Sequence, residues 1–310
     1  MNKKTLLYIG KRVLLALLTI WIVITVTFFV MHAVPGDPFA REGKDLPEAS
    51  RKILEEKFGL DKPLFEQYLG YLKDVVTEFD FGPSLKNEGR EVITIIGDGL
   101  KTSAKLGLIA AVLALVIGVV LGSIAALNRN KFIDRITMVV TTAFVSIPSF
   151  IMGTLLLYLF SVYLGLVSAN GDSWDGLILP AFTLSLSPMA HITRLTRSSM
   201  LDVLGQDYIR TAKAKGVPSH KIIFGHALKN SMIPVITYFG PMLAYIVTGS
   251  LVVEQIFTVP GIGRQFVGSI TDRDYTLIMG TTIVLATFIV VMNLIGDIMY
   301  KVVDPRINLE

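Results

Sequence analysis

The chain has 310 residues, of which 52% are hydrophobic and 17% are charged, and its formal net charge is +4. Soluble domains contain about 25% charged residues, so this composition favours a membrane protein with several spans over a soluble one. Because the sequence contains no cysteine, disulfide bonds, thiolate metal ligands and cysteine nucleophiles are excluded. The sequence therefore predicts an all-α polytopic membrane protein.

The first predicted span is the uncharged run 13–31, which follows four Lys and Arg residues within positions 1–12. A helix of this length can cross a hydrocarbon core of about 30 Å. A cleavable signal peptide would have a shorter apolar region of about 7–15 residues and a small-residue cleavage site. We therefore expect residues 1–32 to form a cytoplasmic N-terminal end and an uncleaved first span.

Residues 33–101 are more polar and contain local signals for two helices. Pro47 and Glu48 are typical of the start of a helix that Gly59 would end. Apolar residues then recur at three- and four-residue spacing over 65–79, which indicates an amphipathic helix. We expect a small helical extracytoplasmic insertion that packs on the membrane domain, either as a spacer or as a contact for a partner.

The rest of the chain, 102–310, is predicted to form a membrane core with five further spans. Pro148 lies inside the third predicted span, 136–164, and prolines also interrupt the run 176–193. Prolines are tolerated in spans when neighbouring helices satisfy the freed carbonyl groups, so they favour a packed bundle. The five runs are 106–128, 136–164, 176–193, 231–253 and 276–296.

The distribution of charge predicts the orientation. With the N-terminus inside, the inner segments contain 16 Lys and Arg residues and 6 Asp and Glu residues, whereas the outer segments contain 13 and 19. Cytoplasmic loops carry an excess of Lys and Arg, so both termini are expected in the cytoplasm. The inner segments in this count are 1–12, 129–135, 194–229 and 297–310.

The longest polar run in the second half of the chain is 206–234, and its capping and helix-breaking residues predict two helices joined by a glycine. Asp207 is expected to cap a short helix that ends at Ala214 or Lys215, and Gly216 can adopt the left-handed cap conformation. Pro218 prevents continuation, and Ser219 is expected to cap the second helix. This elbow is predicted to be either a docking site for a soluble partner or a basic amphipathic segment on anionic lipid.

The sequence lacks common nucleotide-binding, metalloprotease and serine-hydrolase motifs. It contains no G-x-x-x-x-G-K-[S/T], H-E-x-x-H or G-x-S-x-G pattern, and its four histidines are scattered. We therefore expect no catalytic residue, no metal site and no cofactor bound by this chain. Glu254 and Asp297 lie only at the ends of predicted spans, which disfavours a secondary transporter that binds its coupling ion at mid-depth.

Neutral polar residues do occur within the predicted spans. Such residues more often serve packing and hydrogen bonding between helices than ligand contact, but a subset could line a broad passage. The candidates for the lining of a passage are Ser146, Ser149, Tyr238, Tyr245 and Thr248.

The elbow sequence Asp207-Tyr208-Ile209-Arg210-Thr211-Ala212-Lys213-Ala214-Lys215-Gly216 resembles the cytoplasmic loop of binding-protein-dependent ABC importer permeases, in the form found in the first permease of the dipeptide/oligopeptide subfamily. The general family loop reads Glu-Ala-Ala, three residues, then Gly, so two of the three leading positions differ here. Similar patterns follow one another along nearly the whole chain: 35–38 (PGDP), 59–64 (GLDKPL), 147–150 (IPSF), 228–234 (LKNSMIP), 253–257 (VEQIF), 260–263 (PGIG) and 304–306 (DPR).

This resemblance implies a six-helix importer-type ABC transmembrane domain in the cell membrane of a prokaryote. It implies pairing with a second, similar permease, two ATPase subunits that use ATP and Mg²⁺, and an extracellular or periplasmic binding protein that delivers peptide. The loop 194–230 would be the cytoplasmic coupling loop of the permease core. A permease for nickel or another non-peptide solute is the alternative within the subfamily, and a stand-alone channel or membrane enzyme is the alternative outside it.

The resemblance also implies roles for particular residues. Contact with the ATPase is expected at Asp207, Tyr208, Ile209, Arg210, Thr211, Ala212, Lys213, Lys215 and Gly216. An outer gate or a contact with the binding protein is expected at Glu254, Phe257, Pro260, Gly261 and Gly263.

Overall fold

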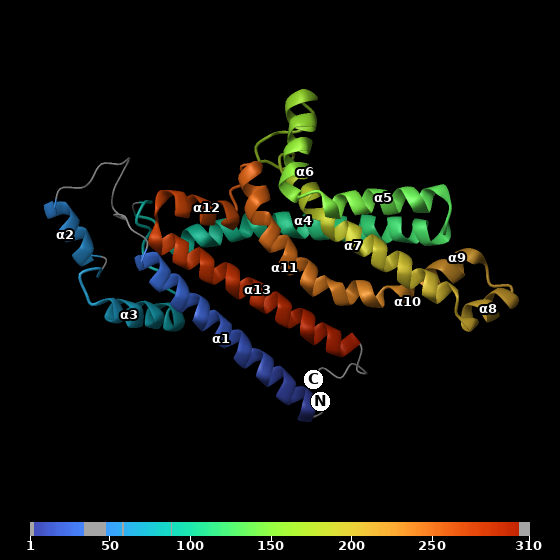
Figure 1. Cartoon of the computed structure of the whole chain (residues 1–310), viewed down its shortest axis with the longest axis horizontal. Coiled ribbons are helices and arrows are strands. Elements are labelled where there is room, and N and C mark those ends of the chain that lie inside the picture. The colour runs from blue at the N-terminus through green and yellow to red at the C-terminus, as the bar shows by residue number, and fades with distance from the viewer. Residues whose placement is uncertain (1–2, 34–47, 58, 88, 304–310) are drawn as a thin grey trace. The chain divides into compact units, whose positions relative to one another are not determined.

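The computed structural model describes residues 3–33, 48–57, 59–87 and 89–303. These residues are mostly helical, as the composition predicts, and Figure 1 shows their course. In chain order the helices are α1 (Lys3–Ala33), α2 (Glu48–Lys57), α3 (Leu64–Thr77), α4 (Val92–Leu127), α5 (Phe132–Ser146), α6 (Ser149–Leu156), the π-helix η1 (Leu157–Tyr163), α7 (Ile178–Leu204), α8 (Asp207–Ala214), α9 (Ser219–Lys221), the π-helix η2 (Ile222–Leu228), α10 (Lys229–Ser231), α11 (Ile233–Ile256), α12 (Ile262–Asp272) and α13 (Tyr275–Val303).

Among the described residues, three helical segments are long and apolar enough to cross a membrane: Leu7–Ala33, Val92–Leu127 and Tyr275–Gly296. Two bent pairs of helices, Phe132–Ser146 with Ser149–Tyr163 and Ile233–Ile246 with Ser250–Ile256, raise the number to five if each pair is one span. α7, which contains residues 178–193 of the predicted fourth span, is not among these segments. The count of six spans therefore stays a prediction.

The predicted span 136–164 is not one helix. It breaks at Pro148 into α5 and the α6–η1 segment, and the two parts are bent by 105°. Proline has no N–H for the helical ladder, and it pushes the preceding residue out of the helical region. Ile147 is accordingly extended, with φ −83° and ψ 123°.

The chain divides into two compact units, which we describe separately. Unit 1 comprises Met1–Ser103 and Pro260–Val291, and unit 2 comprises Ala104–Val259 and Met292–Glu310.

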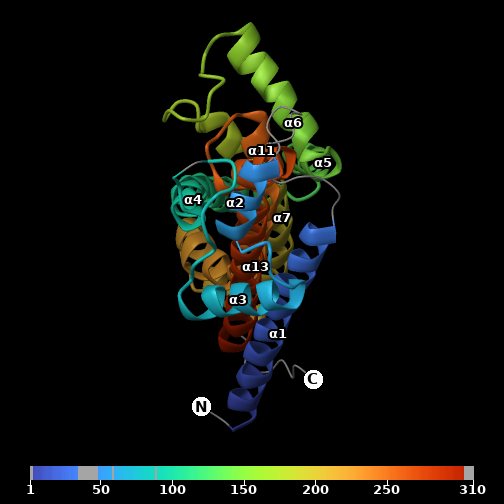
Figure 2. The same cartoon turned by 90° about the vertical axis from the view of Figure 1, so that its left-hand side faces the viewer.

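In unit 1, the insertion contains both predicted helices, α2 and α3, and α3 contacts α1. The contact between these two helices is also visible in Figure 2. Phe28, Tyr68 and Met279 form a small buried cluster, and the hydroxyl groups of Thr25 and Tyr68 lie 2.8 Å apart in a hydrogen bond. The insertion is therefore packed against the first predicted span.

A buried carboxylate fixes the loop that precedes α4 in unit 1. Asp274 is 1% exposed and stands one residue before α13. Its carboxylate accepts hydrogen bonds from the Ser84 hydroxyl and from the backbone N–H groups of Leu85 (3.2 Å), Lys86 (3.3 Å) and Leu277 (3.2 Å). The bond from Leu277 satisfies one of the free N–H groups of the first turn of α13, so Asp274 caps this helix as well.

In unit 2, the core is built from buried residues such as Leu106, Ile192 and Phe257. α4 carries Gly118 and Gly122 four residues apart, and both face α7. A Cβ at Gly118 would lie 2.8 Å from the Ile192 side chain, and one at Gly122 would lie 2.6 Å from the carbonyl oxygen of Thr193. Glycines at this spacing let two membrane helices approach closely, and dispersion contacts then stabilise the pair.

Replacing Gly122 with Val should destabilise the folded chain by about 1–3 kcal/mol, because the backbone of α7 must move away from the new side chain. Thermal unfolding of the purified chain in detergent measures this loss. The matched control is Gly97→Val in the same helix, where no described atom lies within 4 Å of the added Cβ. Equal stability of the two variants would contradict the close contact between α4 and α7.

Candidate functional site

The elbow predicted from the sequence is present in unit 2. α8 runs from Asp207 to Ala214, Gly216 has φ +76°, and the helical segment of α9, η2 and α10 follows from Ser219 to Ser231. Figure 1 shows α8 and α9 beyond the end of α7, and α8 contacts η2. The helix–glycine–helix prediction is confirmed.

Gly216 ends α8 by a Schellman motif. The N–H of Val217 donates to the carbonyl of Ala212 at 3.1 Å, and the N–H of Gly216 donates to that of Lys213 at 3.0 Å. This pair of bonds requires a left-handed residue after the last helical turn, which glycine adopts without steric cost.

The two predicted N-caps are each wrong by one residue. Gln206, which is extended, occupies the N-cap of α8, and Asp207 is the first helical residue. Pro218 likewise occupies the N-cap of α9, and Ser219 is its first residue. Asp207 still supports the helix, because a carboxylate in the first turn interacts favourably with the positive end of the dipole.

The side chains of α8 divide into one buried residue and an exposed face. Ile209 is 0% exposed, so it holds α8 against the rest of unit 2. Tyr208 is 45% exposed, and its hydroxyl accepts a hydrogen bond from the Asn230 side chain at 3.0 Å. Ala212 is half-buried. The other predicted coupling residues are exposed: Asp207, Arg210, Thr211, Lys213, Lys215 and Gly216.

The predicted outer residues fall in both units. Glu254 and Phe257 lie at the end of α11 in unit 2 and are fully buried. The backbone carbonyl of Phe257 accepts a hydrogen bond from the N–H of Gly171 at 3.0 Å, so the loop before α7 is fixed on this end of α11. Pro260, Gly261 and Gly263 belong to unit 1, where Gly261 is the N-cap of α12.

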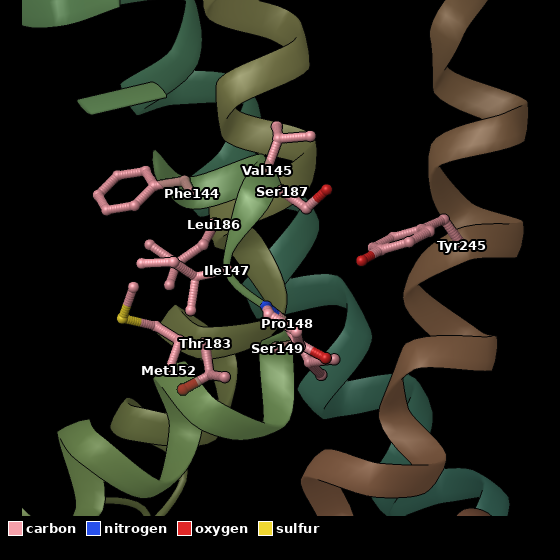
Figure 3. A pocket seen from close by; sticks show the side chains of 11 residues that line it. Phe144, Val145, Ile147, Pro148, Ser149, Met152, Thr183, Leu186, Ser187 and Tyr245 are labelled. Atoms are coloured by element: carbon pink, nitrogen blue, oxygen red, sulfur yellow. The ribbon is translucent and has the colours of Figure 1, made fainter. Parts of the chain in front are cut away.

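The break at Pro148 forms one wall of a pocket of about 90 Å³ in unit 2 (Figure 3). Two predicted passage residues, Ser149 and Tyr245, line it. Figure 3 shows the Tyr245 side chain pointing from α11 toward the segments that carry Ser187 and Ser149. The complete lining is Phe144, Val145, Ile147, Pro148, Ser149, Met152, Thr183, Leu184, Leu186, Ser187 and Tyr245.

The structure does not bring the other three passage candidates into this pocket. Ser146 precedes the break, and the Tyr238 ring lies 5.7 Å from the His191 ring, centroid to centroid. Thr248 lies outside the residues whose side chains the structure describes.

Comparisons with known proteins agree with this architecture. Residues 118–309 match the family described as the inner membrane component of binding-protein-dependent transport systems. The chain belongs to this family. Residues 5–92 match the corresponding N-terminal family. The chain is therefore a multi-pass membrane permease, and the sequence-based identification of its family is confirmed.

Individual relatives extend the match to nearly the full length. The chain is 47% identical to the dipeptide transport system permease protein DppB of Bacillus subtilis over 98% of both chains. It is 42% identical to the oligopeptide transport system permease protein OppB of Haemophilus influenzae, over 97% of this permease and 99% of that one.

Solved structures show the same fold at low sequence identity. The methionine ABC transporter MetNI, in inward-facing conformations, matches with a TM-score of 0.55 and 16% identity over 68% of this chain and 97% of the other. An amino acid ABC transporter with histidines matches with a TM-score of 0.53 and 13% identity, over 67% and 94%. The permease therefore has the fold of an ABC importer transmembrane domain.

Among the pocket residues that were not predicted, Thr183 and Ser187 of α7 carry hydroxyl groups. Their spacing of four residues places both hydroxyl groups on one face of a helix, and this signal is present in the sequence. The motifs at 35–38 and 304–306 lie outside the described residues.

Replacing Gly216 with Ala should loosen α8, because a side chain in the left-handed region costs about 1 kcal/mol. We expect the protected amides of residues 211–217 to exchange with deuterium about fivefold faster, as measured by mass spectrometry. Gly216→Asn should retain most of the protection, since Asn tolerates this conformation. Gly225→Ala, in the same elbow with no described atom within 4 Å of the new Cβ, is the matched control.

Proposed function

We propose that this chain is the translocation subunit of an ATP-driven importer for dipeptides and oligopeptides. The observation that carries the proposal is the near-complete match to relatives named dipeptide and oligopeptide transport permeases, at 47% and 42% identity. A match over nearly all of both chains includes the membrane core, the insertion and the elbow together. The substrate class is therefore more strongly supported than a shared fold alone would allow.

The proposed complex contains a second permease, two ATPase subunits and a solute-binding protein. The ATPases bind and hydrolyse ATP with Mg²⁺, and this chain contributes no nucleotide site. The exposed face of α8 supports docking: Tyr208 offers an aromatic anchor, and Arg210 and Lys213 offer positive charges for acidic groups on an ATPase.

In this proposal the elbow and both termini lie in the cytoplasm, as the excess of Lys and Arg in the inner segments predicts. The binding protein would deliver peptide from the other side, where we expect the insertion and residues 254–263.

The side chains that line the pocket at Pro148 are suited to contact with a peptide. Its hydroxyl groups on Ser149, Ser187 and Tyr245 can donate and accept hydrogen bonds, and they lie among apolar side chains. A neutral polar lining can contact peptide backbone of any sequence without holding a charged side chain tightly. We place the pocket on the wall of the passage.

Peptide uptake by the reconstituted complex tests the proposed function. Liposomes containing both permeases and both ATPases should accumulate radiolabelled peptide when the binding protein and ATP are present. Uptake should disappear when ATP is omitted. Accumulation of a nickel chelate without any accumulation of peptide would contradict the proposal and support the alternative substrate.

The docking role of α8 is tested by Tyr208→Ala. Loss of a half-exposed aromatic anchor should weaken binding of the ATPase at least tenfold, because such anchors dominate interface energies. Binding is measured by surface plasmon resonance on the detergent-solubilised permease pair. Tyr163→Ala, at a tyrosine that is 73% exposed in η1, is the control and should leave the affinity unchanged. Equal affinities for the two variants would exclude Tyr208 from the interface.

A further inference from the structure

A partly buried ion pair joins α5 and α7 in unit 2. The Nε of Arg197 donates to Oδ1 of Asp134 at 2.5 Å, and its Nη2 donates to Oδ2 at 2.7 Å. The Asp134 side chain is 4% exposed and that of Arg197 is 24% exposed. Two parallel bonds to a carboxylate fix orientation as well as distance, so the pair holds the two helices in one relative position.

Asp134 also fixes the turn between α4 and α5. The N–H of Asn130, a residue with φ +65°, donates to Oδ2 of Asp134 at 2.9 Å. The carboxylate thus joins three segments of the chain: the turn, the first turn of α5 and the last part of α7.

A second arginine on the same face of α7 adds another contact with α5. Arg194 precedes Arg197 by three residues, and its Nη2 donates to the backbone carbonyl of Thr141 at 3.1 Å. Thr141 lies two turns beyond Asp134 along α5, so the side chains of α7 bind α5 at two separated points. Two separated contacts prevent α5 from pivoting about either one.

Arg194 and Arg197 lie along α7 between the pocket residue Ser187 and the elbow, and their partners on α5 precede the Pro148 break. α7 ends at Leu204, and only Gly205 and Gln206 separate it from α8. At the other end, α5 stops at Ser146, just before the Pro148 break that lines the pocket. A displacement of α8 therefore reaches the break through α7 and α5 if these helices move together.

Separating the ion pair would leave the buried Asp134 carboxylate without its charged partner, which is unfavourable. The pair is therefore expected to stay closed while the surrounding helices move. We infer that Asp134 and Arg197 form a rigid clamp that transmits displacement of the elbow to the Pro148 break, and that they are positioning residues for coupling. This inference rests on the proposed function.

The test uses the complete complex in liposomes. The double variant Asp134→Asn with Arg197→Gln removes both charges, so neither is left unpaired. We expect ATP hydrolysis to remain within twofold of that of the unmodified complex, while peptide imported per ATP hydrolysed falls at least tenfold. The matched control is Arg51→Gln with Glu55→Gln, which removes a more exposed pair joined at 2.8 Å on α2 and should change neither quantity.

An unchanged ratio of import to hydrolysis, whether both rates fall in parallel or neither falls, would overturn the inference. Cross-linking adds a second test, since the sequence contains no cysteine. In Asp134→Cys with Arg197→Cys, a short bis-maleimide, which alkylates both thiols, should restore import per ATP to within threefold of the unmodified value. Loss of import after cross-linking would show that the contact must open, which also contradicts a rigid clamp.

A measurement that needs no substrate separates this inference from the proposed function. Spin labels at His220→Cys on α9 and Tyr158→Cys on η1 report the distance between the elbow and the far side of the break. We expect this distance to change when the complex is trapped with ATP and vanadate, and the change to vanish in the charge-free double variant. If the unmodified complex imports no peptide, the proposed function fails, and these distances alone decide on the clamp. A change that persists in the double variant overturns it.

Discussion

The constraint that governs this chain is the need to satisfy backbone hydrogen bonds where water is absent. Inside a bilayer, each unpaired N–H or C=O group is costly, so the backbone forms helices wherever it can. The points where the helical ladder is interrupted therefore carry information. In unit 2 the break at Pro148 is such a point, and it lines the pocket.

Local signals made the elbow and the insertion predictable from sequence. A glycine that follows a short helix and precedes a proline specifies a Schellman motif almost by itself, because few other residues accept its left-handed backbone. The apolar spacing over 65–79 predicted α3 for a similar reason. The N-caps were displaced by one residue, since the N-cap is defined by a backbone conformation that Gln206 and Pro218 adopt as readily as Asp or Ser.

Contacts between distant segments were not predictable in this way. Asp134 and Arg197 are 63 residues apart, and each reads in the sequence as one more charge in an inner loop. Only the folded chain shows that α7 continues past the predicted loop boundary at 194 and places Arg197 against α5. The close approach of α4 and α7 is an intermediate case, because the spacing of Gly118 and Gly122 is a recognisable signal, although its partner helix is not specified.

The elbow contains no reactive group, so its contribution has to be mechanical, and its stiffness decides whether it can work. Three features restrict the movement of α8: the hydrogen-bonded cap at Gly216, the fully buried side chain of Ile209, and the hydrogen bond between the side chains of Tyr208 and Asn230. The link to α7 is two residues long, which leaves little room for α8 to move independently. A partner that displaces α8 must therefore displace α7 as well. Packed helices respond by discrete rigid-body shifts rather than by continuous deformation, so the bend at Pro148 is a place in unit 2 where such a shift can be taken up as a change of angle between α5 and α6.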